Sequence, residues 1–229
     1  MVTGSEVTTL SEDRIKRIRR AVMRWGRRNY KPFPWREPAE LWQAVIAEVL
    51  LQRTRADNVV PVYSAFIARY PSAHALSSAT EDDVASLVRP LGLQWRVPLL
   101  TRLSRVLGNS DGRVPRTYNE LVALPGVGPY VAAAVLSLHC GQRHAIVDAN
   151  IVRWLCRIVG TAMDRETRRK KWLLALADDL TPKRNWRAYN YAALDFTMAI
   201  CSRSPRCEDC PVRHPDCAYA ASREVAGQQ

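Results

Sequence analysis

The sequence lacks long apolar runs, sustained strand-like alternation and a secretory leader. Its longest strongly apolar stretches, Ala44–Leu51 and Val131–Leu138, are far shorter than the roughly 18 residues that cross a bilayer. Met1–Glu6 is polar and has no basic segment followed by an apolar run, so we expect no secretory signal. These absences exclude a membrane-spanning protein and predict a cytoplasmic one.

Acidic residues are scarce compared with basic ones. The 229 residues include 22 Asp and Glu against 34 Lys and Arg, which gives a formal charge of +12. Such an excess favours a polyanionic partner, most often nucleic acid, although a merely basic soluble protein also fits. With 47% apolar and 24% charged residues, the chain is not disordered and can bury the core of one large or two small domains.

Helical periodicity dominates the sequence and predicts an all-α protein. Ser11 is a suitable cap for a helix to about Arg28, with apolar residues at helical spacing and many arginines on the other face. The segment Leu41–Gln52 is apolar nearly all round, which indicates a central helix. The other predicted helices are Ala56–Tyr70, Thr80 to about Val88, Trp95–Leu107, Thr117–Leu124, Pro129–Cys140, Asn150–Val159, Arg165–Leu180 and Trp186–Ile200. Thr80 with Asp83, and Thr117 with Glu120, resemble capping boxes at the starts of two of them.

A short glycine-containing turn, Leu124–Gly128, joins two of these predicted helices. Its two glycines allow torsions that other residues resist and let the turn approach another backbone. Exposed amides there, with the free N–H groups of the next helix, suit a phosphate oxygen. Val127 would pack between the helices, and a plain connecting turn is the alternative. Asp148 opens a later helix, where an aspartate is most often an N-terminal cap.

Four of the six cysteines fall near the C-terminus: Cys201, Cys207, Cys210 and Cys217, separated by five, two and six residues. In a cytoplasmic chain, this clustering favours a metal site over disulfides. The spacing alone leaves zinc and an iron–sulfur cluster open. Cys140 and Cys156 stand apart and are expected to be buried core thiols.

Two motifs, Leu124–Tyr130 and Val147–Asn150, resemble the helix-hairpin-helix (HhH-GPD) DNA glycosylase superfamily, which includes endonuclease III and MutY. The resemblance covers nearly the whole chain in family order: Phe33–Trp35, Glu48–Gln52, the hairpin, Asp148, Asn190 and the cysteine cluster. Tyr130 looks most like the Mig-type thymine/uracil mismatch glycosylases.

The resemblance implies two helical lobes with a DNA cleft between them. Residues 36–140 would form a six-helix barrel with the hairpin. Residues 1–35 and 141–229 would form a discontinuous helical domain with the cluster loop. Glu48 and Asp148 would then face each other across the cleft. The implied metal is a four-iron four-sulfur (4Fe-4S) cluster, with zinc as the alternative, although the outer two cysteine gaps are interchanged relative to the family.

Three residues are implied to be catalytic. Asp148 would stabilise positive charge on the sugar and orient the attacking water. Glu48, which interrupts an apolar stripe, would assist departure of the base, and a salt-bridged glutamate is the alternative. Tyr130 stands where bifunctional members carry a lysine. A phenol cannot form a Schiff base, so the prediction is a monofunctional enzyme in which Tyr130 packs against the sugar or base, unless it is a core tyrosine.

The same resemblance implies a set of DNA contacts. Gln52 would fill the space left by a flipped base, and Gln94 with Trp95 would form a second wedge. Surface contact alone is the alternative for either. The complete set of expected DNA-binding residues is Gln52, Arg53, Gln94, Trp95, Leu124, Gly126, Val127, Gly128 and Asn150. The expected partner is duplex DNA with a mismatched or damaged base, bound by a nucleoid-associated monomer.

The function that these residues predict is hydrolytic removal of thymine or uracil mispaired with guanine. A MutY-like adenine glycosylase is the nearest alternative. Tyr130 disfavours it, as does the expectation that too little chain follows Cys217 for the additional domain of that branch. An endonuclease III-like lyase is disfavoured by the missing lysine. A non-catalytic DNA-binding module and a zinc-stapled protein-interaction domain are the remaining alternatives.

Overall fold

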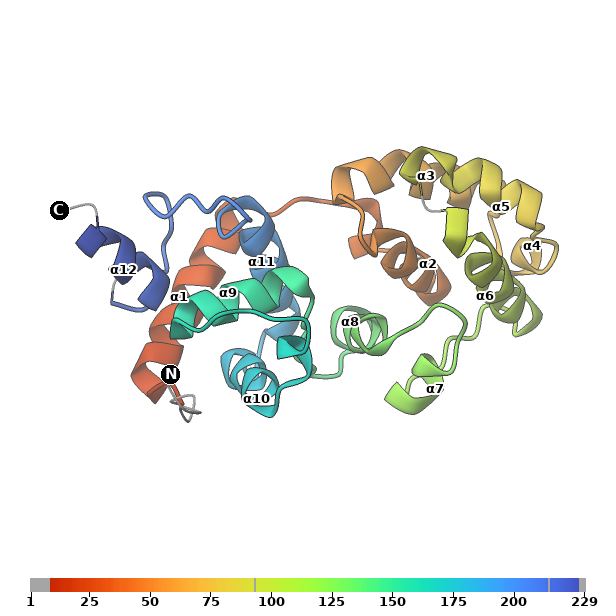
Figure 1. Cartoon of the computed structure of the whole chain (residues 1–229). Helices are drawn as coiled ribbons and strands as arrows, with labels where there is room; N and C mark the ends of the chain where they lie inside the picture. The colour runs from red at the N-terminus through yellow and green to blue at the C-terminus, as the bar shows by residue number, and fades with distance from the viewer. Residues whose placement is uncertain (1–8, 93, 214, 227–229) are drawn as a thin grey trace. The chain divides into compact units, whose positions relative to one another are not determined.

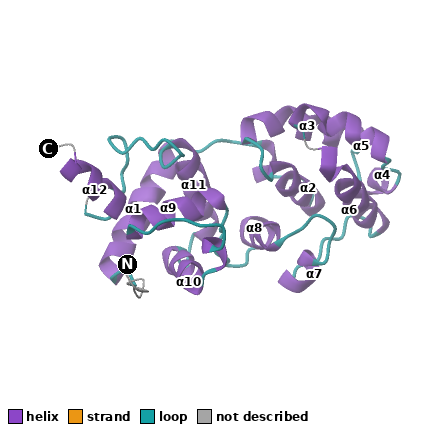
Figure 2. Cartoon of the chain, viewed as in Figure 1, coloured by secondary structure: helices purple, strands orange, loops and turns teal. Residues whose placement is uncertain are grey.

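The computed structural model describes residues 9–92, 94–213 and 215–226, and within these ranges it contains helices and turns but no β-strand (Figure 2). The all-α prediction is therefore confirmed. None of the described helices is both long and apolar enough to cross a bilayer. The chain divides into two compact units: unit 1 comprises Met1–Lys31 and Arg143–Gln229, and unit 2 comprises Pro32–Gln142 (Figure 1).

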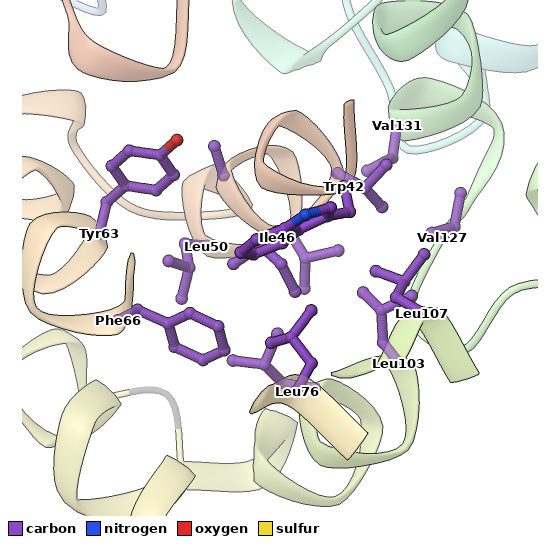
Figure 3. Close-up of a cluster of buried hydrophobic side chains, with 14 of the residues drawn as sticks. Trp42, Ile46, Leu50, Tyr63, Phe66, Leu76, Leu103, Leu107, Val127 and Val131 are labelled. Carbon is purple, nitrogen blue, oxygen red and sulfur yellow. The ribbon is translucent and has the colours of Figure 1, made fainter. Parts of the chain in front are cut away.

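Unit 2 is organised around one enclosed helix, α2 (Leu41–Leu51), in which every residue from Trp42 to Leu50 is buried. Trp42 and Ile46 lie among apolar side chains from the surrounding helices, as Figure 3 shows. The other elements of unit 2 are η1 (Pro34–Arg36), α3 (Ala56–Arg69), α4 (Ala73–Ser77), α5 (Glu81–Val88), η2 (Arg89–Leu91), η3 (Gln94–Arg96), α6 (Val97–Asn109), α7 (Tyr118–Val122) and α8 (Pro129–His139). The central position predicted for this helix is confirmed.

Two further details fix the packing of unit 2. A Cβ atom added at Gly108 of α6 would lie 2.3 Å from the backbone nitrogen of Ser77, so only a glycine permits this approach of α6 to the end of α4. Thr80 and Thr117 cap α5 and α7, because their hydroxyl oxygens accept hydrogen bonds from the backbone N–H groups three residues later. Both predicted caps are confirmed.

Unit 1 contains α1 (Glu12–Arg28), α9 (Ala149–Val159), η4 (Thr167–Arg169), α10 (Lys171–Leu180), α11 (Trp186–Ala199) and α12 (Ala218–Ala226). Ser11 caps α1, as its sequence predicts, and Ile18 and Val22 are fully buried. The rings of Trp25 and Trp154 both meet Phe196 edge-on, with centroids 5.6 Å away. Three helices, α1, α9 and α11, therefore share one core.

The structure corrects two predicted helices. The helix expected over Trp95–Leu107 is a 3₁₀ turn to Arg96 followed by α6, with Pro98 in the first turn of α6, where its missing N–H costs nothing. The helix expected from Arg165 begins only at Lys171. Upstream, Asp164 accepts hydrogen bonds from Thr167, Lys170 and a backbone N–H, which holds a separate turn. Helices α4 and α12 were not predicted.

Candidate active site and nucleic-acid interface

The turn between α7 and α8 is a tight hairpin in unit 2. Gly126 has a φ of 75°, a left-handed conformation that favours glycine. Gly128 has a φ of −98°, so the prediction of unusual torsions holds for Gly126 alone. Between them, Val127 is 5% exposed and belongs to the core of unit 2, as expected. Tyr130, in the first turn of α8, is half-buried and packs against the same core.

Gln52 is bonded to this hairpin. Its side-chain Nε2 donates a hydrogen bond of 3.0 Å to the carbonyl oxygen of Gly126. Gln52 follows the last residue of α2, and Arg53 after it has a left-handed φ of 58°. The structure therefore joins the residue expected to insert into DNA to the turn expected to bind phosphate, across 74 residues of sequence.

Glu48 lies one helical turn before Gln52 and is 3% exposed. Because α2 is buried on all sides, the carboxyl group of Glu48 is held inside unit 2 by packing of the whole helix. A buried carboxyl group is rarely found in proteins without a partner or a role. Its burial makes it a candidate proton donor or acceptor.

Trp95 is the most exposed large apolar side chain of the described residues, at 58%. Two guanidinium groups lie near its ring: the Arg96 Cζ atom is 4.6 Å and the Arg53 Cζ atom 5.9 Å from the ring centroid. The structure thus brings the Gln52–Arg53 turn and Trp95 together. Gln94, by contrast, is exposed and its side chain lies 3.5 Å from the carbonyl oxygen of Ala85.

Asp148 is the N-cap of α9 in unit 1. Its Oδ1 accepts a 2.7 Å hydrogen bond from the backbone N–H of Ile151, and its Oδ2 accepts a 2.8 Å bond from Asn150 Nδ2. Burial raises the pKa of Asp148 above its ordinary value, while these hydrogen bonds and the charge of Arg153 act in the opposite direction. The capping role and a catalytic role are compatible, because both need a carboxylate fixed at this helix end.

Arg153 connects the Asp148 region to the cysteine loop. Its Nη2 donates to Asn150 Oδ1 at 3.0 Å and to the carbonyl oxygens of Thr197 and Cys201 at 3.3 and 3.1 Å. Its Nε also donates to Cys201, at 3.1 Å. A continuous hydrogen-bonded path therefore runs from Asp148 through Asn150 and Arg153 to the first cysteine of the cluster.

The four clustered cysteines line a single pocket in unit 1, together with Trp154, Arg157 and Tyr219. Arg157 Nη1 lies 3.3 Å from the Sγ atom of Cys201, and the backbone N–H of Val212 donates to Cys210 Sγ at 3.4 Å. In the described ranges, no three His, Cys, Asp or Glu side chains are grouped closely enough to hold a metal ion. The donor set still fits a thiolate-bound cluster, because four thiols share one pocket that already supplies N–H donors to sulfur.

The two other cysteines lie away from this pocket. Cys156 is buried in the core of unit 1, and Cys140 is half-buried against the core of unit 2. Both are free thiols. The prediction of a fully buried thiol is thus correct for Cys156 and only partly so for Cys140.

Sequence reasoning missed three arginines that organise these sites: Arg96, Arg153 and Arg157. Arg153 and Arg157 are four residues apart on α9 and so share one face of it. Two arginines at this spacing beside a predicted Asp cap are a usable signal. Nothing in the local pattern distinguishes Arg96, because its burial depends on contacts with α2.

Comparison with known proteins gives consistent results. A family model described as "HhH-GPD superfamily base excision DNA repair protein" matches residues 46–175. A thymine-DNA glycosylase of Aeropyrum pernix is 38% identical over 212 residues, which cover 89% of this chain and 94% of that protein. A thymine/uracil-DNA glycosylase of Pyrobaculum aerophilum is 33% identical, with 91% and 94% covered. The structure of a thermostable thymine-DNA glycosylase superimposes with a TM-score of 0.82 at 32% identity, covering 92% of this chain and 98% of that one.

The Arg153 contacts predict a measurable loss of stability. In Arg153→Met, the carbonyl oxygen of Thr197 and Oδ1 of Asn150 lose their Arg153 donor, and the carbonyl oxygen of Cys201 keeps its 3.3 Å hydrogen bond from Arg157. We expect a loss of about 2 kcal/mol, or about 4–8 °C in the thermal unfolding midpoint. Arg102→Met on α6 is the matched control, because Arg102 is exposed, and should leave the midpoint unchanged. Equal midpoints for the two variants would contradict the prediction.

Proposed function

The chain belongs to the HhH-GPD superfamily of base excision DNA repair proteins, and on that premise we propose that it is a monofunctional DNA glycosylase. Its substrate is duplex DNA in which thymine or uracil is mispaired with guanine, and the names of two relatives contain thymine or thymine and uracil as the base. The observation that carries the proposal is the desolvated Asp148 carboxylate, fixed at the start of α9 by hydrogen bonds to both of its oxygens. The net charge of +12 suits a polyanionic partner.

The carboxyl groups of Asp148 and Glu48 act on the two sides of the bond that breaks. Breaking the bond between C1′ of deoxyribose and N1 of the base leaves positive charge on the sugar and negative charge on the base. Asp148 stabilises the sugar cation and accepts a proton from the water whose oxygen bonds to C1′. Glu48, buried one helical turn before Gln52, provides a proton or a hydrogen bond to the departing base.

Tyr130 determines that water is the nucleophile. An amine at this position would attack C1′ and lead to strand cleavage, and a phenol cannot form that Schiff base. The half-buried ring of Tyr130 is at the start of α8, where it can pack against the sugar or the flipped base. The product is therefore an abasic site in an intact strand.

Three parts of unit 2 bind the duplex. The hairpin Leu124–Gly128 presents backbone amides to a phosphate. Gln52 enters the space left by the flipped base and hydrogen-bonds the orphaned guanine, and Trp95 stacks in the helix as a second wedge. Arg53, beside Trp95, contacts the backbone. In unit 1, Asn150 binds near the sugar while it holds Asp148.

Cys201, Cys207, Cys210 and Cys217 would hold a 4Fe-4S cluster. The cluster would supply a covalent cross-link of the C-terminal loop. Arg157, which donates to the Cys201 sulfur and to the carbonyls of Ser202 and Arg203, shapes that loop. The cluster takes no part in the bond-breaking steps, which depend on the chain's own carboxyl groups.

The activity can be tested with labelled duplexes that contain G·T, G·U, G·A and oxidised-G·A pairs. We expect breaks at T or U only after hot alkali, which reveals an abasic site. Asp148→Asn should still bind the duplex but release base about 10³-fold more slowly. Asp164→Asn is the matched control, since Asp164 also accepts local hydrogen bonds but lies outside the site. Release at A, or breaks without alkali, would contradict the proposal.

The raised pKa of Asp148 predicts the acid side of the pH profile. Only the ionised form stabilises the sugar cation, so base release falls as pH drops through the raised pKa, above the usual value of about 3.9. Because Arg153 lowers this pKa, Arg153→Met should move the acid limb to higher pH. Single-turnover rates across the acidic range measure both effects. An acid limb at or below the ordinary value for aspartate would exclude this role.

The cluster assignment is tested by metal analysis of protein purified without oxygen. We expect about four iron and four sulfide per chain, and a marked loss of both in Cys210→Ser. Cys140→Ser is the control and should retain full iron, because Cys140 lies in unit 2 outside the pocket. Stoichiometric zinc in place of iron would refute the cluster.

A further inference from the structure

Arg96 is a buried cation with few partners. Arg96 is only 4% exposed, and its Nη1 donates a hydrogen bond of 3.1 Å to the carbonyl oxygen of Val49. Within the described part of the chain, its Nε and Nη2 atoms find no hydrogen-bond partner and no carboxylate pairs with it. A buried charge so poorly compensated destabilises the folded state.

The neighbours of Arg96 indicate what a destabilising buried charge does at this position. Its guanidinium lies 4.6 Å from the centre of the exposed Trp95 ring. Val49, which accepts its hydrogen bond, is in the last turn of α2, three residues before Gln52. One guanidinium therefore contacts both segments of unit 2 that are proposed to enter the DNA helix. Desolvation, and then the charge of Arg53, lower the pKa of Arg96.

We propose that Arg96 is a positioning residue for base flipping, which holds Trp95 and the Gln52 turn as one rigid wedge. This inference rests on the proposed function. An exposed indole free to rotate would lose entropy when it stacks in DNA, whereas a ring held by a cation over its face is already ordered. The Gln52–Gly126 hydrogen bond extends the same unit to the hairpin. Arg96 acts through Trp95 and α2 without contacting the reacting atoms.

If Arg96 is a positioning residue, replacing it should slow base release without lowering the stability of the folded protein. Arg96→Met keeps the length of the side chain and removes its charge, so we expect an equal or higher thermal unfolding midpoint. With a G·T duplex carrying 2-aminopurine beside the mismatch, we expect a smaller fluorescence rise on binding. Single-turnover base release should be about tenfold slower, equivalent to about 1.4 kcal/mol. Arg102→Met, which removes an exposed arginine from the adjoining helix, should match wild type in both assays.

Two further variants separate a positioning role from a general structural role. Arg96→Lys keeps the charge but loses the planar group and should restore part of the fluorescence change. Because Arg96 acts mainly through Trp95, Trp95→Ala combined with Arg96→Met should be no slower than Trp95→Ala alone. Additive losses, or a lower midpoint in Arg96→Met, would assign Arg96 to the core and overturn the proposal.

A failure of the Arg96 proposal can be distinguished from a failure of the proposed function. If the wild-type protein releases no base from any mismatch, the proposed function fails, and the 2-aminopurine signal still decides the role of Arg96. If the wild type releases thymine or uracil and Arg96→Met matches it in rate and fluorescence, only the Arg96 proposal fails.

Discussion

The enclosure of helix α2 by apolar side chains is the constraint on which unit 2 depends. A helix buried from Trp42 to Leu50 cannot rotate or slide without opening the core that surrounds it (Figure 3). Glu48 and Gln52, one turn apart, are consequently fixed relative to each other to within the tolerance of core packing. The position of the hairpin is fixed in the same way, because Val127 is part of this core and the Gln52 side chain donates a hydrogen bond to Gly126. Polar groups that would be mobile on a loop are thus held by hydrophobic packing.

Unit 1 fixes its polar residues by a different means. Asp148 is held by hydrogen bonds and, through Asn150 and Arg153, is connected to the backbone of the cysteine loop. Desolvation raises the pKa of its carboxyl group, while donors and a nearby guanidinium limit the rise. The carboxyl group is therefore poorly hydrated, and the hydrogen bonds to both of its oxygens favour its ionised form. A carboxylate in this condition interacts strongly with a developing positive charge, because water screens it little.

Local sequence patterns predicted most of the helices and the caps at Ser11, Thr80 and Thr117, because these features depend on neighbouring residues. The start of α10 was missed, because the side chain of Asp164 organises a competing turn that periodicity does not reveal. Helix α4 is only five residues long, too short to show a period. In the site, the individual residues could be named from motifs, but the Gln52–Gly126 bond and the burial of Arg96 could not. Both depend on tertiary contacts between distant segments.

Some charged groups of this protein are exposed to solvent and others are buried, and the buried ones lie next to residues with a proposed role in the reaction or in DNA binding. Pairs such as Arg69–Asp83 and Lys170–Asp164 are on the surface, where solvent screens the charges and an ion pair contributes little to stability. Glu48 and Arg96 are desolvated, at a cost to folding that hydrophobic packing must offset. A sequence selected for stability alone would place apolar residues there. Their positions next to Gln52 and Trp95 are explained if rigidity and reactivity at the DNA-binding surface outweigh the loss of stability.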